Sequence, residues 1–453
     1  MNRISLPLLV CAFILSGCSL MPDWIGAERE KKMEGERMEV LPDKSDLRAD
    51  QSLQNVNVVL PPVAVNTIWL NSNFGQTYHL ALKVPFSEDK TEDVGDEPNQ
   101  EAQRIDANPV IAKDIIYVLD GGGTLSARPV GDISESIWEA DLRSETFSDG
   151  FFGLSKGVEK EKFLGGHISY DEDKIFVTTA VGDVVALDAR RGYEIWRRSF
   201  NLPIRSAPVA DSGVVYLITV NNQLYAVDAN TGKTNWTHAG ITETTGVLGA
   251  PSPVVSGGYV LAPYSSGELY VLRKDNGAMV WADSMAALNL HSTSLFSLND
   301  IDASPVVYEG VVYAVGHEGV LTATELTTSK RIWEQEISSI KTPWIVGDFI
   351  FLLSTNDELI CIYRPDGRIK WIAPLPSYQN PKQHKDKITW NGPVVAGNVV
   401  FAVNSIGELY ELSPQTGEVI GVQEVEENIF LPPIVVDKKM YLLNNSSELT
   451  ILN

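Results

Sequence analysis

Cysteine, positive charge and long apolar runs are all scarce in this 453-residue sequence. Of its three cysteines, two lie within the first 18 residues, so Cys361 has no disulfide partner in the body of the chain. We expect Cys361, in the strand-like run 359–363, to be a small buried residue. The net charge of −23 excludes a nucleic-acid-binding protein, because tracking phosphates requires a basic face.

Motifs that carry chemistry are also missing. The six histidines form no short metal-ligand spacing, and there is no G-x-S-x-G sequence. The run Gly121-Gly122-Gly123 lies between two predicted strands with no helix after it, which indicates a hairpin turn and not a phosphate cradle. We therefore expect no catalytic residues, no metal and no cofactor.

The N-terminus has the features of an export signal. Arg3 precedes an apolar stretch at 4–15 that is too short to span a bilayer, and Leu15-Ser16-Gly17-Cys18 follows. This order resembles the bacterial lipobox, which implies that Cys18 is lipidated and that residues 1–17 are removed. Two or more acyl chains give stable anchoring. By analogy with the lipoprotein sorting rule, Ser19 in place of aspartate points to the outer membrane, facing the periplasm.

Residues 18–62 are polar and rich in mixed charge, which predicts a lipidated flexible tether. The segment 35–42 within it is either a recognition peptide or a solvated spacer. Residues 63–453 have the patterning of a folded domain.

An internal repeat fills this domain. Each unit reads Pro-Val, an apolar strand, a Leu-Tyr-Ala-Leu-Asp-like strand, Thr-Gly and a strand with tryptophan, and the tryptophans are Trp138, Trp196, Trp236, Trp281, Trp333 and Trp371. One four-stranded unit cannot bury both of its faces, so the units are expected to stack radially. The repeat predicts an all-β, eight-bladed β-propeller of four-stranded antiparallel blades, with the tryptophans packed between blades.

The last unit supplies three strands and no tryptophan strand, so we expect an N-terminal strand to close the last blade. The segment 64–69, which contains Trp69, is the candidate. A seventh, degenerate unit has Ile420 assigned to the tryptophan position.

Three insertions interrupt the repeats. Residues 87–101 are acidic and predict a mobile loop. Residues 143–166 and 282–299 carry apolar side chains, and each either docks a partner or folds back on its own blade.

The repeats resemble those of the pyrroloquinoline-quinone dehydrogenases, but the adjacent cysteines of many such enzymes are missing. Lipobox, tether and eight repeats together resemble the BamB-type lipoproteins of the outer-membrane β-barrel assembly (BAM) machinery. This resemblance implies a monomeric, non-catalytic accessory protein that binds the periplasmic domains of BamA, contacts other BAM subunits and aids unfolded outer-membrane protein clients. A quinoprotein dehydrogenase and a peptidoglycan-binding propeller are the alternatives.

The resemblance also implies partner-binding residues. The family's Asp-x-Asp-x-Ser/Thr-Pro motif matches Asp300 and Asp302, which either bind the partner or cap the turn that leads into their blade. A second segment, apolar and ending in arginine, falls by repeat register on Val247 and Leu248, with leucine in place of the arginine. Arg205 matches that segment locally but lies one blade earlier.

Overall fold

The computed structural model describes residues 47–87, 89–98, 103–143, 145–149, 156–160, 163–242, 251–285, 300–317 and 319–453. Residues Asp46–Asn453 form one compact unit. Cys18 and the segment 35–42 lie outside the described residues. Within the described part, no helix has both the length and the apolar character needed to cross a membrane.

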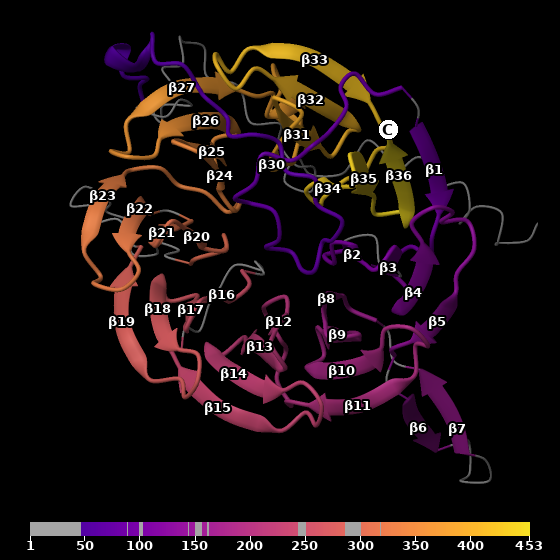
Figure 1. The fold of residues 1–453 in the computed structure, drawn as a ribbon. Helices are drawn as coiled ribbons and strands as arrows, with labels where there is room; N and C mark the ends of the chain where they lie inside the picture. Colours follow the sequence, from indigo (N-terminus) through magenta and orange to yellow (C-terminus); the bar gives the residue numbers. More distant parts are fainter. Residues whose placement is uncertain are drawn as a thin grey trace, which may run out of the picture. The chain divides into compact units, whose positions relative to one another are not determined.

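Eight four-stranded antiparallel sheets follow one another around a ring, which confirms the predicted propeller (Figure 1). Blades 1 to 4 consist of β2 (Val110–Ala112), β3 (Ile115–Leu119), β4 (Thr124–Pro129), β5 (Trp138–Asp141); β8 (Gly166–Asp171), β9 (Lys174–Thr179), β10 (Asp183–Asp188), β11 (Glu194–Ser199); β12 (Val209–Asp211), β13 (Val214–Thr219), β14 (Gln223–Asp228), β15 (Thr234–Ala239); β16 (Val254–Ser256), β17 (Tyr259–Pro263), β18 (Glu268–Arg273) and β19 (Met279–Ser284). Blades 5 to 8 consist of β20 (Val306–Tyr308), β21 (Val311–Val315), β22 (Leu321–Glu325), β23 (Arg331–Gln335); β24 (Trp344–Val346), β25 (Phe349–Leu353), β26 (Glu358–Tyr363), β27 (Ile369–Pro374); β30 (Trp390–Ala396), β31 (Val399–Asn404), β32 (Glu408–Leu412), β33 (Val419–Glu424); β34 (Ile434–Val436), β35 (Lys439–Leu443), β36 (Glu448–Leu452) and β1 (Asp89–Asp93).

In the described part of the chain, two small hairpins lie outside the blades. The strands β6 (Glu145–Asp149) and β7 (Lys156–Lys160) pair within the insertion 143–166 and point away from the ring (Figure 1). The strands β28 (Tyr378–Asn380) and β29 (Lys385–Lys387) pair between blades 6 and 7. Most of the insertion 282–299 lies outside the described residues.

An N-terminal strand closes the last blade, as predicted, but it is not the predicted segment. The strand β1 pairs with β36, so residues 89–93 of the expected mobile loop form a regular edge strand. Trp69 forms an isolated bridge with Ile111 in blade 1 instead. The assignment of residues 64–69 to the closing strand was wrong because the true closing strand, β1, is the exposed outermost strand of its blade. It pairs through its backbone, so its sequence Asp-Lys-Thr-Glu-Asp needs no apolar alternation and gave no strand signal.

The tryptophans join each blade to the next through a repeated contact. Six indole Nε1 atoms donate to backbone carbonyl oxygens of the following blade, in the pairs Trp138–Ala189, Trp196–Ala229, Trp236–Lys274, Trp281–Leu326, Trp333–Arg364 and Trp371–Pro414. The turn glycine of the next blade lies under the ring: a Cβ at Gly277 would lie 2.4 Å from Trp236. The Thr-Gly element of the repeat is therefore a docking position for the preceding tryptophan.

Blade 7 departs from this pattern. Gly421 pairs with Glu411 where blades 1 to 6 pair tryptophan with a small or branched residue, so the assignment of Ile420 to the tryptophan position was wrong by one residue. Ile420 is 58% exposed. In place of the missing indole, Phe86 lies against Phe401 with ring centroids 6.0 Å apart.

Residues 62–86 cross the end of the ring at which the first two strands of the blades turn (Figure 1). Leu80 bridges to Ala396, and the Asn66 carbonyl accepts a hydrogen bond of 2.8 Å from the Asp437 amide. Tyr78 of the same segment accepts, through its carbonyl oxygen, a hydrogen bond of 2.9 Å from Nε1 of Trp344 in blade 6. This segment therefore lines one end of the central cavity.

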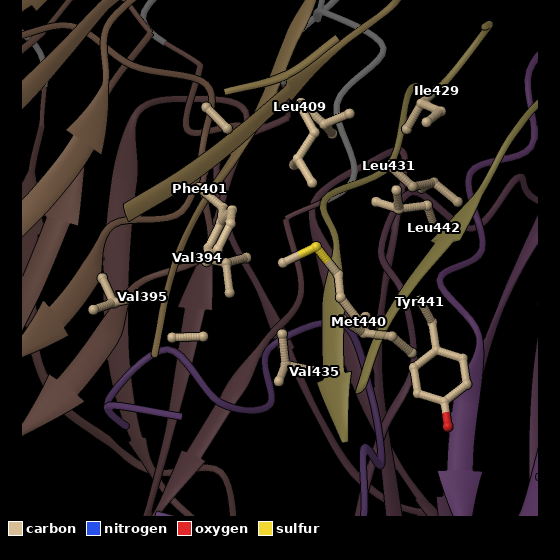
Figure 2. Packing of buried hydrophobic residues seen from close by; sticks show 14 of the residues in the cluster. Val394, Val395, Phe401, Leu409, Ile429, Leu431, Val435, Met440, Tyr441 and Leu442 are labelled. Atoms are coloured by element: carbon tan, nitrogen blue, oxygen red, sulfur yellow. The ribbon is translucent and has the colours of Figure 1, made fainter. Parts of the chain in front are cut away.

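The core is made of the inner strands of neighbouring blades. Its largest cluster joins blades 6, 7, 8 and 1, and Figure 2 shows the part between blades 7 and 8, where Phe401 and Met440 approach each other. Val394, Val435 and Leu442 fill the space around them and are at most 1% exposed. The stacked faces of the blades thus supply the apolar burial that no single blade could.

Candidate functional site

Arg205 ties two distant inter-blade loops together. It lies in the loop before β12 of blade 3, where its amide donates to the Ile218 carbonyl at 2.9 Å. Its guanidinium forms an ion pair with Asp300 and a second one, at 3.3 Å, with Asp302, both in the loop before β20 of blade 5. The same nitrogen also donates to the Ile301 carbonyl at 3.1 Å.

The two aspartates predicted from the motif, Asp300 and Asp302, are therefore paired with Arg205, which lies one blade before the position that the repeat register gave for the family's arginine. The side chains of Arg205, Asp300 and Asp302 are 7%, 2% and 3% exposed. His317 adds a contact of 2.8 Å from Nδ1 to Asp302. We call Arg205, Asp300, Asp302 and His317 the loop clamp, because their contacts join the loops of blades 3 and 5. Burial in a low dielectric strengthens such charge-assisted bonds.

The clamp changes how the predicted residues are interpreted. Asp300 and Asp302 are buried and have intramolecular partners, so they shape the loops of blades 3 and 5 and are not open hydrogen-bond acceptors. Val247 and Leu248 lie outside the described residues. Removing one member of a buried ion pair leaves an uncompensated charge. Substitution of Asp300 or Asp302 is therefore expected to destabilise the fold whether or not a partner protein contacts these residues.

Loops and turns of blades 2 and 3 expose apolar side chains. Val181, Leu202, Val220 and Ile241 are 39%, 36%, 44% and 54% exposed, and we call them the apolar rim. Val181 and Val220 each lie in the turn between the second and third strands of a blade. The sequence offered a usable signal at Val220, an apolar residue between Thr219 and Asn221 in a turn, but none at Val181, which lies between Ala180 and Gly182.

Contacts to backbone carbonyl oxygens bring the loops that carry the apolar rim against one another. The Val220 amide donates to the Pro203 carbonyl at 3.0 Å, which joins the loop before β12 to the turn of blade 3. Asn222 Nδ2 donates to the Ile241 carbonyl at 2.6 Å, which brings the segment after β15 against the same turn. A Cβ at Gly182 would lie 2.2 Å from the Leu202 carbonyl, so Val181 neighbours Leu202. Exposed apolar side chains gathered on neighbouring loops are typical of a protein-binding face.

The described residues offer little for catalysis. No group of three or more His, Cys, Asp or Glu among them is arranged to hold a metal ion. Cys361 is fully buried in β26, as predicted, and burial raises the pKa of its thiol well above the usual range. A thiol in that state is a poor nucleophile.

Comparison with known families gives one family-level match. The sequence profile described as "Outer membrane protein assembly factor BamB" matches residues 132–373. The outer membrane protein assembly factor BamB of Yersinia pestis is 26% identical over 331 residues, covering 72% of this chain and 79% of that protein.

Solved structures give the same fold. The crystal structure of BamB from Moraxella catarrhalis has a TM-score of 0.64 and 19% identity, covering 81% of this chain and 99% of that one. A quinohemoprotein alcohol dehydrogenase from Comamonas testosteroni has a TM-score of 0.60 and 14% identity, covering 89% and 82%. At these identities the likeness concerns the propeller fold, which assembly factors and dehydrogenases share.

Proposed function

The chain belongs to the family of outer membrane protein assembly factor BamB, and on that premise we propose that it is a non-catalytic accessory lipoprotein of the BAM complex. In this proposal Cys18 carries the lipid, residues 1–17 are removed, residues 18–62 are the tether and 63–453 the propeller. The protein is held on the outer membrane, facing the periplasm, and is monomeric within the complex. It binds BamA, contacts other BAM subunits and aids the folding and insertion of unfolded outer-membrane proteins.

The observation that carries the docking proposal is the apolar rim together with the loop clamp. Four exposed apolar side chains lie together on inter-blade loops and turns of blades 2 and 3. In the loop that carries Leu202, the ion pairs of Arg205 with Asp300 and Asp302 hold the backbone in one arrangement. A rigid, partly apolar surface loses little conformational entropy on binding, which favours specific docking.

This arrangement gives the motif residues a defined part in docking. Asp300, Asp302 and Arg205 position the face that BamA would contact, while Leu202 and Val220 supply contact area. Val247 and Leu248 are proposed to extend the same face, because the described chain reaches it at Ile241 and Thr242 just before them.

Co-purification from detergent-solubilised membranes tests the proposal. The double variant Leu202→Glu, Val220→Glu places two charges on the rim and is expected to lower BamA recovery at least about tenfold, since burying an unpaired charge at an interface is costly. Its melting temperature should remain close to wild type because both positions are exposed.

Val419→Glu is the matched control. Val419 is 48% exposed but lies on the outer strand β33 of blade 7, away from the clamp, so this variant should retain BamA. Full BamA recovery by the rim variant would contradict the docking face. Recovery of murein or of a bound quinone in place of BamA would contradict the function itself. Loss of membrane association in Cys18→Ser is expected independently.

A further inference from the structure

A cavity of about 1040 Å³ occupies the centre of the ring. Trp69, Ser72 and Gln76 of the N-terminal segment line it, together with residues of the loops that lead into the blades. Val220 of the apolar rim and Ile340 lie on its lining as well. It is large enough to hold an organic molecule and not only water.

Among the described residues, two positively charged side chains on the cavity wall have no acidic partner. Lys341 Nζ donates to Asn391 Oδ1 at 2.7 Å, and Asn391 is fully buried. The Arg104 guanidinium carbon lies 3.9 Å from the centroid of the Phe430 ring. Within the described ranges, neither cation has a carboxylate at ion-pair distance, although the protein as a whole carries a charge of −23. Burial, with a smaller contribution from Arg104, lowers the pKa of Lys341 to about 8.

Asp106 and Asp302 are the acidic residues on the described cavity lining. Asp302 is held by Arg205 and His317 in the loop clamp. Asp106 lies beside the loop that leads into blade 2, where its carbonyl is 3.0 Å from His167 Nδ1. Lys341 lies in the loop before β24 of blade 6, and Arg104 lies against Phe430 in the loop before β34 of blade 8.

The rest of the wall near the cations is apolar and aromatic. Trp344 and Leu431 line it and are 2% and 9% exposed. Trp69 also lines the cavity and is 2% exposed.

We propose that the central cavity binds a carboxylate carried on an apolar body, with Arg104 and Lys341 holding the carboxylate and the walls formed by Trp69, Trp344 and Leu431 enclosing the body. Arginine supplies a bidentate fork and lysine a second charge, the usual pair for a carboxylate. The apolar wall favours such an acid over free phosphate, which is more strongly hydrated. The carboxylate belongs either to a small organic acid or to the end of a peptide.

Calorimetric titration with matched probes tests this assignment. The probes are 3-phenylpropionate, the peptide acetyl-Gly-Phe with a free carboxylate, the amides of both, and inorganic phosphate. We expect the acids to bind at least about tenfold more tightly than their amides, and phosphate to bind more weakly than either acid. The tighter of the two acids identifies the source. Equal binding of acid and amide, tighter binding of phosphate, or no binding of either acid would overturn the proposal.

Variants assign the binding to the two cations. Arg104→Ala and Lys341→Met should each weaken acid binding at least about tenfold, while Lys341→Arg should retain most of it. Arg198→Ala is the control, because Arg198 lies over the Phe200 ring at 4.4 Å but outside the cavity. At pH 8.5, binding to wild type should take up a fraction of a proton and binding to Lys341→Met should not. Unchanged affinity in both cavity variants, with melting curves confirming the fold, would refute the site.

Discussion

Phe86 and Phe401 lie with ring centroids 6.0 Å apart, and this pair replaces the tryptophan contact that blade 7 lacks. Phe86 comes three residues before β1, so one segment of the chain supplies both the aromatic ring and the closing strand at the seam, by which we mean the contact between blades 7 and 8. The last two blades are thus joined by a residue from outside the repeats.

We therefore expect Phe86→Ala to destabilise the ring at this seam. The half-buried ring should cost ~2 kcal/mol of unfolding free energy, below the range for fully buried phenylalanine. Urea denaturation measures this effect. Tyr378→Ala, which removes a ring from the β28–β29 hairpin, should change stability much less, and equal effects of the two would contradict the seam model.

Proline substitutions in β1 test the closure at single-residue resolution. The Val94 amide donates to the Ser447 carbonyl at 2.9 Å, and antiparallel alternation then directs the amide of Glu92 toward β36 and that of Thr91 away from it. Glu92→Pro should lower the unfolding free energy by about 3 kcal/mol and Thr91→Pro by much less. Matching melting temperatures for the two variants would show that β1 pairing contributes little.

Two glycines separate backbone strain from tryptophan packing. Gly277 and Gly213 have φ of +72° and +77°, but a Cβ at Gly277 would meet Trp236 at 2.4 Å, whereas a Cβ at Gly213 meets nothing within 4 Å. Gly213→Ala should cost about 1 kcal/mol from its backbone conformation alone. Gly277→Ala should cost about 1–3 kcal/mol more because the indole must move. Thermal unfolding of both variants measures the difference.

A double-mutant cycle on the loop clamp distinguishes a structural pair from independent surface charges. Arg205→Met leaves Asp300 buried without this partner and should cost about 3–5 kcal/mol. In Arg205→Met, Asp300→Asn the remaining charge is gone, so the double variant should be less destabilised than the sum of the single variants by about 1–3 kcal/mol. Additive effects in urea denaturation would show that the two side chains do not interact.

Lys341 predicts a rise of stability in alkali. Its pKa is about 8 in the folded protein and 10.5 in a free lysine, so between these values the unfolded state binds more protons. The unfolding free energy therefore rises with pH across this window, and below pH 8 the cost of burying the charge is fully present. The stability of wild type relative to Lys341→Met should increase by about 3 kcal/mol from pH 7.5 to pH 10.5. A flat difference would mean that Lys341 titrates normally.

Much of the propeller could be predicted because its repeat records the contacts between blades. Trp236 and Gly277 recur at fixed spacing since each blade must dock on the next. The closing strand could not be found this way, because Lys90 and Thr91 pair through their backbones at an exposed edge where apolar side chains are not required. Trp69, expected in that strand, is instead buried against Phe74 with ring centroids 5.8 Å apart.

Only the aspartates of the candidate site could be predicted from the sequence, and their pairing with Arg205 could not. The aspartate motif was visible in sequence, but its partner Arg205 lies 95 positions before Asp300. Repeat register suggested that such an arginine belongs in the neighbouring loop before blade 4. In the ring, the loops before blades 3 and 5 approach each other at the centre, so a long side chain reaches across the intervening blade.

The pairing of β1 with β36 also determines when the molecule can be completed. Thr91 and Thr450 meet across this blade although 359 positions separate them in the sequence. Blades 1 to 7 involve only neighbouring strands and can form one after another as the chain becomes available, whereas blade 8 must wait for the last strand. Until then β1 and the inner faces of blades 1 and 7 lack their final neighbours. Because long-range strand pairing is slow and leaves edges exposed, we expect the joining of the two ends to be the slowest and most aggregation-exposed step of folding.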